Sequence, residues 1–279
     1  MSSATSAWCF FGQARGLRVT ADQFNKWAAY SSVDMYAVLQ RSNNEVDDNA
    51  KLLKLKGLHM YVPTPYTDLY PNLNKTVGHW AYPPMRRIVE NYLLIRERFN
   101  LVRYREIVLM RTDLVIVYPF AGKIIDRKDS SRRQLGVYSK DAFGGVEINT
   151  VALANSSFHE YLGILDEYFR YPYEYNQFMN PERMIKKVLM RNNFMITTIP
   201  RNAFLVSDAR EEHLRKSSFG WSTRKTKHPL TGIFVMSLYK EHFFQAVRNS
   251  HAFFSACRMS CNELVQTDSN HHWSLDIKV

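Results

Sequence analysis

The sequence predicts an α/β fold in which helices flank a mixed, mostly parallel sheet, within a single domain of 279 residues. Two observations favour this class. Short apolar runs alternate with longer segments of helical periodicity, which is the pattern of strands joined by crossover helices. The first strand also leads through a glycine-bounded loop directly into a helix, as the first unit of such a fold does.

Composition and charge narrow the class of protein. With 46% hydrophobic and 14% aromatic residues the chain is globular, and its net charge of +11 predicts a face that attracts nucleic acid, anionic lipid or nucleotide phosphates. The three cysteines, Cys9, Cys257 and Cys261, are too few for a disulfide framework and incomplete as a zinc site. A secretory leader and a run of about 18 apolar residues are both absent, so we expect a soluble, cytoplasmic protein without a membrane span.

A strand, a loop and a helix open the chain. The predicted elements of this first part are a strand at Trp8–Phe11, a helix at Val19–Tyr30, a strand at Ser32–Leu39 and a strand at Leu58–Val62. The first loop has Gly12 and Gly16 at its ends, so its backbone N–H groups can approach a phosphate or a base, and Arg15 adds a cation. The alternative is an ordinary tight turn.

A long amphipathic helix at Met85–Asn100 precedes the central strand. Because the helix runs directly into that strand, its first turn, with Arg86 or Arg87, is placed at the rim of the crevice beside the strand end. The alternative is a solvated ion pair between Arg86 and Glu90, which stand four residues apart.

The central stretch is apolar and rich in β-branched residues, except at Arg111-Thr112-Asp113. Strands at Ile107–Met110 and Leu114–Val117 leave this polar triplet where the first of them ends. A buried carboxylate is costly unless it is paired, hydrogen-bonded or bound to a metal. Ligands of open α/β sheets lie outside the carboxyl ends of the strands, so the triplet marks a candidate binding site. The alternative is an Arg111–Asp113 ion pair that only ends the strand.

The second half continues the alternation. The predicted elements are a basic loop at 122–133, a strand and loop at Val137–Val146, a helix at Asn149–Phe169, a helix begun by Asn180-Pro-Glu, a strand at Phe194–Ile199, a basic loop at Arg201–Lys227 and a helix at Tyr239–Cys257. Asn180 is placed as the helix cap and the proline in its first turn.

Four short motifs in this order resemble the nucleotide-sugar glycosyltransferases of the GT-A fold. The motifs are Gly12-Gln-Ala-Arg15, Arg111-Thr-Asp113, Asp141-Ala-Phe-Gly-Gly145 and Asn180-Pro-Glu182. The resemblance spans roughly residues 8 to 200. The sequence is also similar to glycosyltransferases that large algal DNA viruses, the chloroviruses, encode to decorate their capsid glycans, among them a xylosyltransferase.

This resemblance implies a GT-A-like, Rossmann-type domain over residues 1–279 that moves a sugar from a nucleoside-diphosphate sugar to a glycan hydroxyl. A UDP-sugar, with UDP-xylose as one candidate, and an inverting mechanism are favoured. Residues 1–120 would form the nucleotide-binding half and 121–279 the acceptor side, with no nucleic-acid partner and, for a viral enzyme, the host cytoplasm as location. The implied donor-binding residues are Gly12, Gln13, Arg15, Arg86, Arg111 and Asp113.

Many enzymes of this kind hold the diphosphate through Mn²⁺ or Mg²⁺ bound by an Asp-x-Asp motif, and both ions accept carboxylate and water ligands. Here the motif reads Arg-Thr-Asp, which leaves Asp113 as its one carboxylate. Asp113 would share the ion with a distant group, His271 or His272, or work without a metal. Adjacent histidines of a strand point to different faces, so at most one of the two is a ligand.

An inverting transfer requires a carboxylate that removes the proton of the acceptor hydroxyl. Asp141 is the first candidate and Glu182 the second. Their alternative roles are a turn cap for Asp141 and a helix-dipole charge for Glu182. Two other functions are left open, namely a basic nucleic-acid-binding protein whose tyrosines stack on bases and a catalytically silent glycan-binding protein on the same fold.

Overall fold

The chain folds into two compact units. The computed structural model describes residues 4–14, 17–41, 48–65, 82–116, 133–138, 145–170, 180–199, 203–207, 225–227, 234–236, 265–266 and 273–274. Unit 1 comprises residues 1–14, 32–112 and 121–199, and unit 2 comprises 15–31, 113–120 and 200–279. Each unit takes segments from both predicted halves, so the division into a nucleotide half and an acceptor half stays a prediction.

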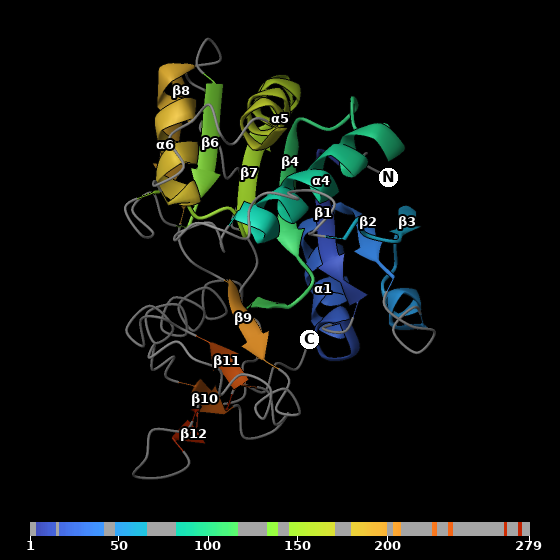
Figure 1. Ribbon diagram of the computed structural model, residues 1–279. Coiled ribbons are helices and arrows are strands. Elements are labelled where there is room, and N and C mark those ends of the chain that lie inside the picture. Colours follow the sequence, from blue (N-terminus) through green and yellow to red (C-terminus); the bar gives the residue numbers. More distant parts are fainter. Residues whose placement is uncertain are drawn as a thin grey trace. The chain divides into compact units, whose positions relative to one another are not determined.

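Unit 1 is built on a seven-stranded sheet with the order β3-β2-β1-β4-β7-β6-β8 (Figure 1). The strands are β1 (Ser6–Gln13), β2 (Asp34–Gln40), β3 (Gly57–Tyr61), β4 (Glu106–Arg111), β6 (Arg133–Val137), β7 (Thr150–Ala154) and β8 (Phe194–Thr198). Neighbouring strands are parallel except at β7, which is antiparallel to both β4 and β6. The predicted α/β class with a mixed, mostly parallel sheet is therefore confirmed.

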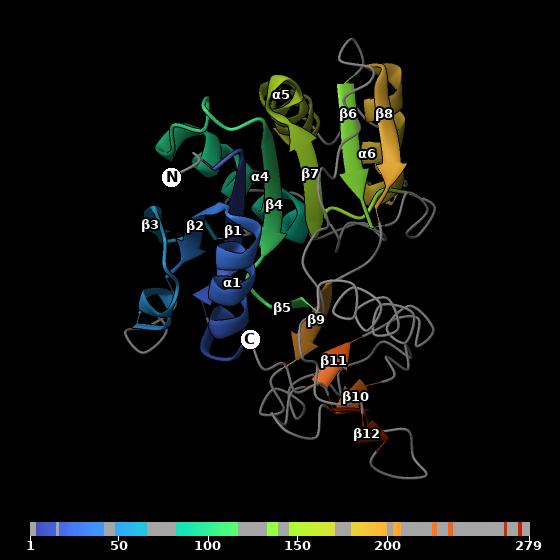
Figure 2. The same cartoon turned by 180° about the vertical axis from the view of Figure 1, so that it is seen from behind.

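Three helices of unit 1 cover one face of this sheet. They are α4 (Tyr82–Arg98), α5 (Asn155–Arg170) and α6 (Pro181–Arg191), and a short 3-10 helix, η2 (Ala50–Leu52), lies before β3. Alternate residues of the strands, such as Phe11, Val38 and Leu109, share one buried cluster with residues of all three helices. Figure 2 shows the sheet from the other side, with its strands in front of these helices.

The segment Asn149–Phe169, predicted as one helix, is a strand followed by a helix. Residues 150–154 form β7, and α5 begins only at Asn155. The prediction was wrong because a strand buried on both faces reads as a continuous apolar run, which merges with the apolar positions of a following helix when no glycine or proline separates them. Asn155 marks the junction, since its Nδ2 donates to the Leu101 and Tyr104 carbonyls at 2.9 and 2.7 Å.

Two further segments differ from the prediction. β6 ends at Val137, where a strand was expected to begin, and Arg133 begins β6 although it was assigned to the preceding loop. The stretch 201–227, predicted as a loop, contains the strands β9 (Ala203–Ser207) and β10 (Lys225–Lys227). The predicted helix at 239–257 lies outside the described residues. Among the helices that the structure describes, none combines the length and the apolar character needed to cross a membrane.

Unit 2 contains a small antiparallel sheet with the order β10-β11-β9-β5, where β5 is Leu114–Ile116 and β11 is Phe234–Met236. Helix α1 (Leu17–Ser31) is held to β5 by two side chains, since Gln23 Nε2 and Trp27 Nε1 each donate to a β5 carbonyl at 3.1 Å. The two-residue strands β12 (Val265–Gln266) and β13 (Trp273–Ser274) pair with each other.

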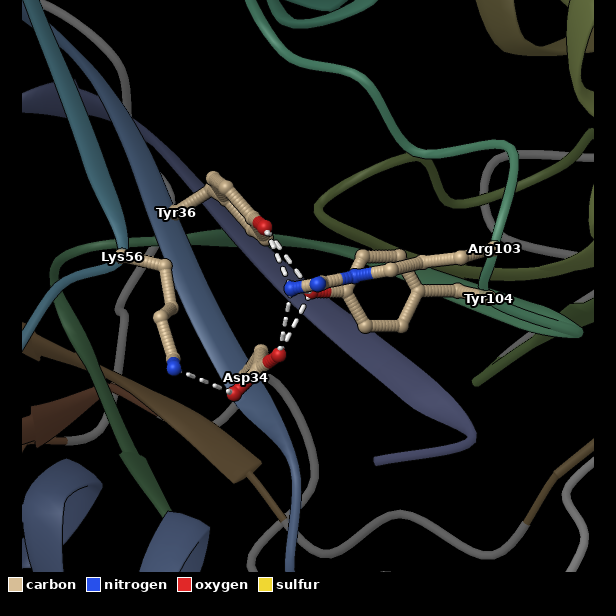
Figure 3. Close-up of polar contacts among 5 residues, drawn as sticks. All are labelled: Asp34, Tyr36, Lys56, Arg103 and Tyr104. Atoms are coloured by element: carbon tan, nitrogen blue, oxygen red, sulfur yellow. Dashed lines mark hydrogen bonds and ion pairs between the residues drawn. The ribbon is translucent and has the colours of Figure 1, made fainter. Parts of the chain in front are cut away.

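A polar cluster joins β2 to the residues that directly precede β3 and β4, at the end of the unit 1 sheet where these strands begin (Figure 3). The Asp34 carboxylate accepts from the Tyr104 hydroxyl at 2.6 Å and from Arg103 Nη2 at 2.9 Å, and Lys56 Nζ lies 3.8 Å away. Tyr36 and Tyr104 place their hydroxyl oxygens 2.8 Å apart. Since burial raises the pKa of Tyr104, its hydroxyl stays protonated and donates to Asp34.

Removing the Tyr104 hydroxyl tests how much the polar cluster contributes to the stability of the fold. The Tyr104→Phe variant is expected to lose about 1.5–3 kcal/mol of unfolding free energy, because a hydrogen bond to a charged group is lost. Tyr36→Phe removes the bond between the two neutral hydroxyls and a long contact from Arg103 Nη2 at 3.4 Å, and it is expected to lose less, about 0.5–1.5 kcal/mol. Urea unfolding of both variants measures the difference, and equal losses would contradict the role assigned to Asp34.

Candidate functional site

The strand order of unit 1 reverses between β1 and β4. From β1 the chain proceeds to β2 and β3 on one side, and it then returns to place β4 on the other side of β1. In an open α/β sheet such a reversal opens a crevice outside the carboxyl ends of the two strands, and ligands bind there. The candidate site of this chain is therefore the edge at which β1 ends in Gly12-Gln13 and β4 ends in Arg111.

Polar side chains replace the apolar core at this edge. Gln13 is the last residue of β1 and is exposed, two positions after the buried core residue Phe11. It is in register with Gln40 at the end of β2, and Gln40 is in register with Tyr61 at the end of β3. The Tyr61 hydroxyl donates to Asn91 Oδ1 of α4 at 3.1 Å. The row Gln13, Gln40 and Tyr61 thus carries hydrogen-bonding groups across three strand ends.

Gly12 and Thr112 shape the ends of β1 and β4 at this edge. Gly12 has a φ of 111°, in the region that favours glycine, so the sequence requires glycine here for its backbone. Thr112 is buried, and its hydroxyl donates to the Gln13 carbonyl at 2.6 Å while its backbone N–H donates to the Phe11 carbonyl at 3.2 Å. Thr112 therefore ties the ends of β1 and β4 together, a role that its place between two charged residues did not reveal.

Arg111 is held from the β7 side. Its backbone N–H donates to the Asn149 carbonyl at 3.3 Å, and its Nη1 donates to Asn149 Oδ1 at 3.2 Å. Asn149 Nδ2 in turn donates to Glu147 Oε1 at 3.5 Å. Glu147 and Asn149 were not predicted as site residues, because Asn149 was placed at the start of a predicted helix and Glu147 just before it. The signal that was available is a pair of polar residues, two apart, immediately before an apolar run.

Glu182 is the candidate base that the structure describes. It lies in the first turn of α6, where Asn180 Oδ1 accepts from the Glu182 backbone N–H at 2.8 Å, so the predicted cap is confirmed. Oε2 of its carboxyl group is buried and has no hydrogen-bond partner among the described residues. Burial raises the pKa of Glu182, and this exceeds the opposing effect of the hydrogen bonds from its backbone and from Asn180.

The segment 145–149 connects Glu182 with Arg111. At one end, the backbone N–H of Val146 donates to the Glu182 carbonyl at 3.1 Å, and at the other Asn149 accepts from Arg111. From Val146 to Asn149 the chain can span roughly 11 Å when fully extended. A carboxyl group with a raised pKa and a guanidinium thus belong to one edge of unit 1.

Arg86 is engaged by a neighbouring helix. Its Nη1 lies 2.9 Å from Asp166 Oδ1 of α5, and both side chains are largely buried. Glu90, predicted as a partner of Arg86, forms an ion pair with Arg87. Arg86 therefore joins α4 to α5, and its contact with a nucleotide stays a prediction.

The remaining predicted site residues are not brought together by the described structure. Asp113 follows Thr112 directly and is the first residue of its segment in unit 2, whereas Arg15, Asp141, His271 and His272 lie outside the described residues. Among the residues that are described, no group of three histidine, cysteine, aspartate or glutamate side chains is arranged to hold a metal ion. Metal binding by Asp113 with His271 or His272 stays a prediction.

No protein-family model and no curated protein sequence matches the chain. Solved structures that resemble it include a glycosyltransferase involved in glycosylation of the major capsid of PBCV-1, at 8% identity and a TM-score of 0.39 over 69% of this chain and 81% of that one. The galactosyltransferase LgtC, in complex with donor and acceptor sugar analogs, is 11% identical with a TM-score of 0.42, over 68% and 73%. The glycosyltransferase GlyE of Streptococcus pneumoniae is 10% identical with a TM-score of 0.38, over 70% and 45%. At these identities no residue role is carried over to this chain.

Proposed function

We propose that the protein is a glycosyltransferase that uses a nucleoside-diphosphate sugar as donor and a glycan hydroxyl as acceptor. The observation that carries this proposal is the shared edge of unit 1, where Arg111 ends the strand at the β1/β4 reversal and the segment 145–149 links it to Glu182. A cation suits a diphosphate leaving group, and a carboxyl group of raised pKa suits a hydroxyl that must lose its proton. The order of the four sequence motifs supports the same function.

In the proposed mechanism, the polar groups at this edge of unit 1 have separate roles. The polar row Gln13, Gln40 and Tyr61 offers hydrogen bonds to the nucleoside, and Arg111 offsets the charge that develops on the diphosphate as the sugar leaves. Glu182 or Asp141 removes the proton of the acceptor hydroxyl, which corresponds to inversion at the anomeric carbon. The favoured donor class is a UDP-sugar, with UDP-xylose as one candidate. If a divalent ion takes part, Mn²⁺ or Mg²⁺ is the expected one, with Asp113 as a ligand.

A binding and turnover experiment tests this function. The protein is expected to gain thermal stability with a UDP-sugar or GDP-sugar, by about 2.7 kcal/mol at a hundredfold excess over the dissociation constant. It is also expected to release the nucleoside diphosphate when a glycan acceptor is added. Stabilisation without release would indicate a silent glycan-binding or nucleotide-binding protein. No stabilisation by any nucleotide-sugar, with or without Mn²⁺, would contradict the proposal.

A further inference from the structure

We propose that Arg111, oriented by Asn149 and Glu147, binds the donor diphosphate directly, so that donor binding needs no divalent metal ion. This inference rests on the proposed function and specifies how its site holds the leaving group. It assigns Arg111 as the diphosphate ligand and Asn149 and Glu147 as positioning residues.

The backbone of Arg111 is fixed from both sides. β4 pairs in parallel with β1, which places Arg111 in register with Phe11, one residue before the positive-φ Gly12. On the other side, its N–H donates to the carbonyl of Asn149, which directly precedes β7. The residue that ends β4 at the sheet reversal is therefore a cationic one, held between two neighbouring strands.

The guanidinium itself is oriented by an amide. Asn149 presents its Oδ1 to Arg111 Nη1 at 3.2 Å and its Nδ2 to Glu147 Oε1 at 3.5 Å. With a cationic donor on one side and a carboxylate on the other, only one orientation of the amide satisfies both contacts. A chain of hydrogen bonds of this kind polarises its members and restricts the rotamers of the arginine. Arg111 is thus positioned in advance of ligand binding.

The guanidinium at this strand end suits an anion better than a cation. A guanidinium stays protonated, and its planar fork forms paired hydrogen bonds with phosphate oxygens. A divalent ion, by contrast, needs several oxygen ligands and is repelled by a fixed positive charge. The hydroxyl of Thr112 donates to the Gln13 carbonyl, and within the described part of the chain no three metal-ligating side chains gather. The fixed positive charge of Arg111 then takes the place that a metal ion occupies where the motif has two carboxylates.

Donor binding measured with and without metal tests the inference. UDP is the probe, with GDP in parallel, and its dissociation constant is determined by calorimetry in EDTA and in Mn²⁺. The wild-type protein is expected to bind equally well in both, within about twofold. Arg111→Met is expected to bind about 10- to 100-fold more weakly, because charge-assisted hydrogen bonds are lost. Arg111→Lys keeps the charge and is expected to recover part of that loss.

The positioning role of Asn149 is tested by steady-state kinetics. Asn149→Ala is expected to raise the donor KM in the transfer assay while the acceptor KM stays unchanged, and to have little further effect when combined with Arg111→Met. Wild-type UDP binding that disappears in EDTA and returns with Mn²⁺, or an Arg111→Met variant that binds UDP as the wild type does, would overturn the inference and leave the proposed transferase standing. Absence of nucleotide-sugar binding in both conditions would overturn both.

Discussion

The Glu182→Gln variant is expected to lose about 10²- to 10⁴-fold in kcat for sugar transfer, the usual contribution of a general base. The amide has nearly the same shape as the carboxyl group but cannot accept the proton of the acceptor hydroxyl. UDP affinity is expected to stay unchanged, since the proposed ligand of the diphosphate is Arg111 and not Glu182. Steady-state kinetics together with UDP titration checks both expectations. A variant with wild-type kcat would remove Glu182 from the mechanism and leave Asp141 as the candidate base.

The same variant is expected to change the pH dependence of stability. Burial raises the folded-state pKa of Glu182, so ionisation of this group destabilises the folded state once the pH exceeds the unfolded value of about 4.3. The destabilisation grows as the pH rises through the folded pKa and is complete above it. Gln carries no such cost, so Glu182→Gln is expected to have the higher Tm at pH 8, with the difference closing as the pH falls below about 4.3.

Glu167→Gln provides the matched control for this pH series. Glu167 is exposed on α5, so its substitution is expected to leave the Tm close to that of the wild type across the series. Melting curves of the three proteins between pH 4 and pH 8, at about half-unit steps, separate the contributions. A difference between Glu182→Gln and the wild type that does not vary with pH would show that the carboxyl group titrates normally.

Gly145→Ala is expected to destabilise unit 1 by about 3 kcal/mol or more, at or beyond the upper end of the usual cost of overpacking. A Cβ atom at this position would lie 2.0 Å from the carbonyl carbon of Glu182 and 2.2 Å from the Arg183 nitrogen. Both are backbone atoms in the first turn of α6, so no side-chain rotation relieves the clash. The segment must separate from the helix, which also breaks the bond from the Val146 N–H to the Glu182 carbonyl.

Gly163→Ala is the control for this substitution. Gly163 is exposed in the middle of α5, and a Cβ there meets no atom within 4 Å. The change is expected to stabilise the protein by roughly 0.5–1 kcal/mol, because alanine loses less backbone entropy in a helix than glycine does. Denaturant unfolding measures both effects. A Gly145→Ala variant as stable as the wild type would contradict the close packing of this segment on α6.

Local patterns predicted the elements whose residues differ most clearly from their neighbours. β1 was recognised from its apolar run and the glycine that follows, and α6 from its Asn180 cap and first-turn proline. β7 was not recognised, because both of its faces are buried and its pairing with β4 and β6 is not visible in its local sequence. Its apolar residues carry no information on whether the partners are strands or helices.

Some features of the candidate site could likewise be predicted from the sequence, and others could not. The sequence by itself determined that Arg111 ends a buried strand, that Gly12 lies near the end of another, and that Glu182 lies in the first turn of a helix, because each property depends on residues close by in the chain. Only the tertiary structure decided that Asn149 and Glu147 orient Arg111 and that the segment 145–149 joins this arginine to Glu182. These contacts depend on the register of β4 against β7 and on the packing of Gly145 on α6, and both are set by interactions between distant segments.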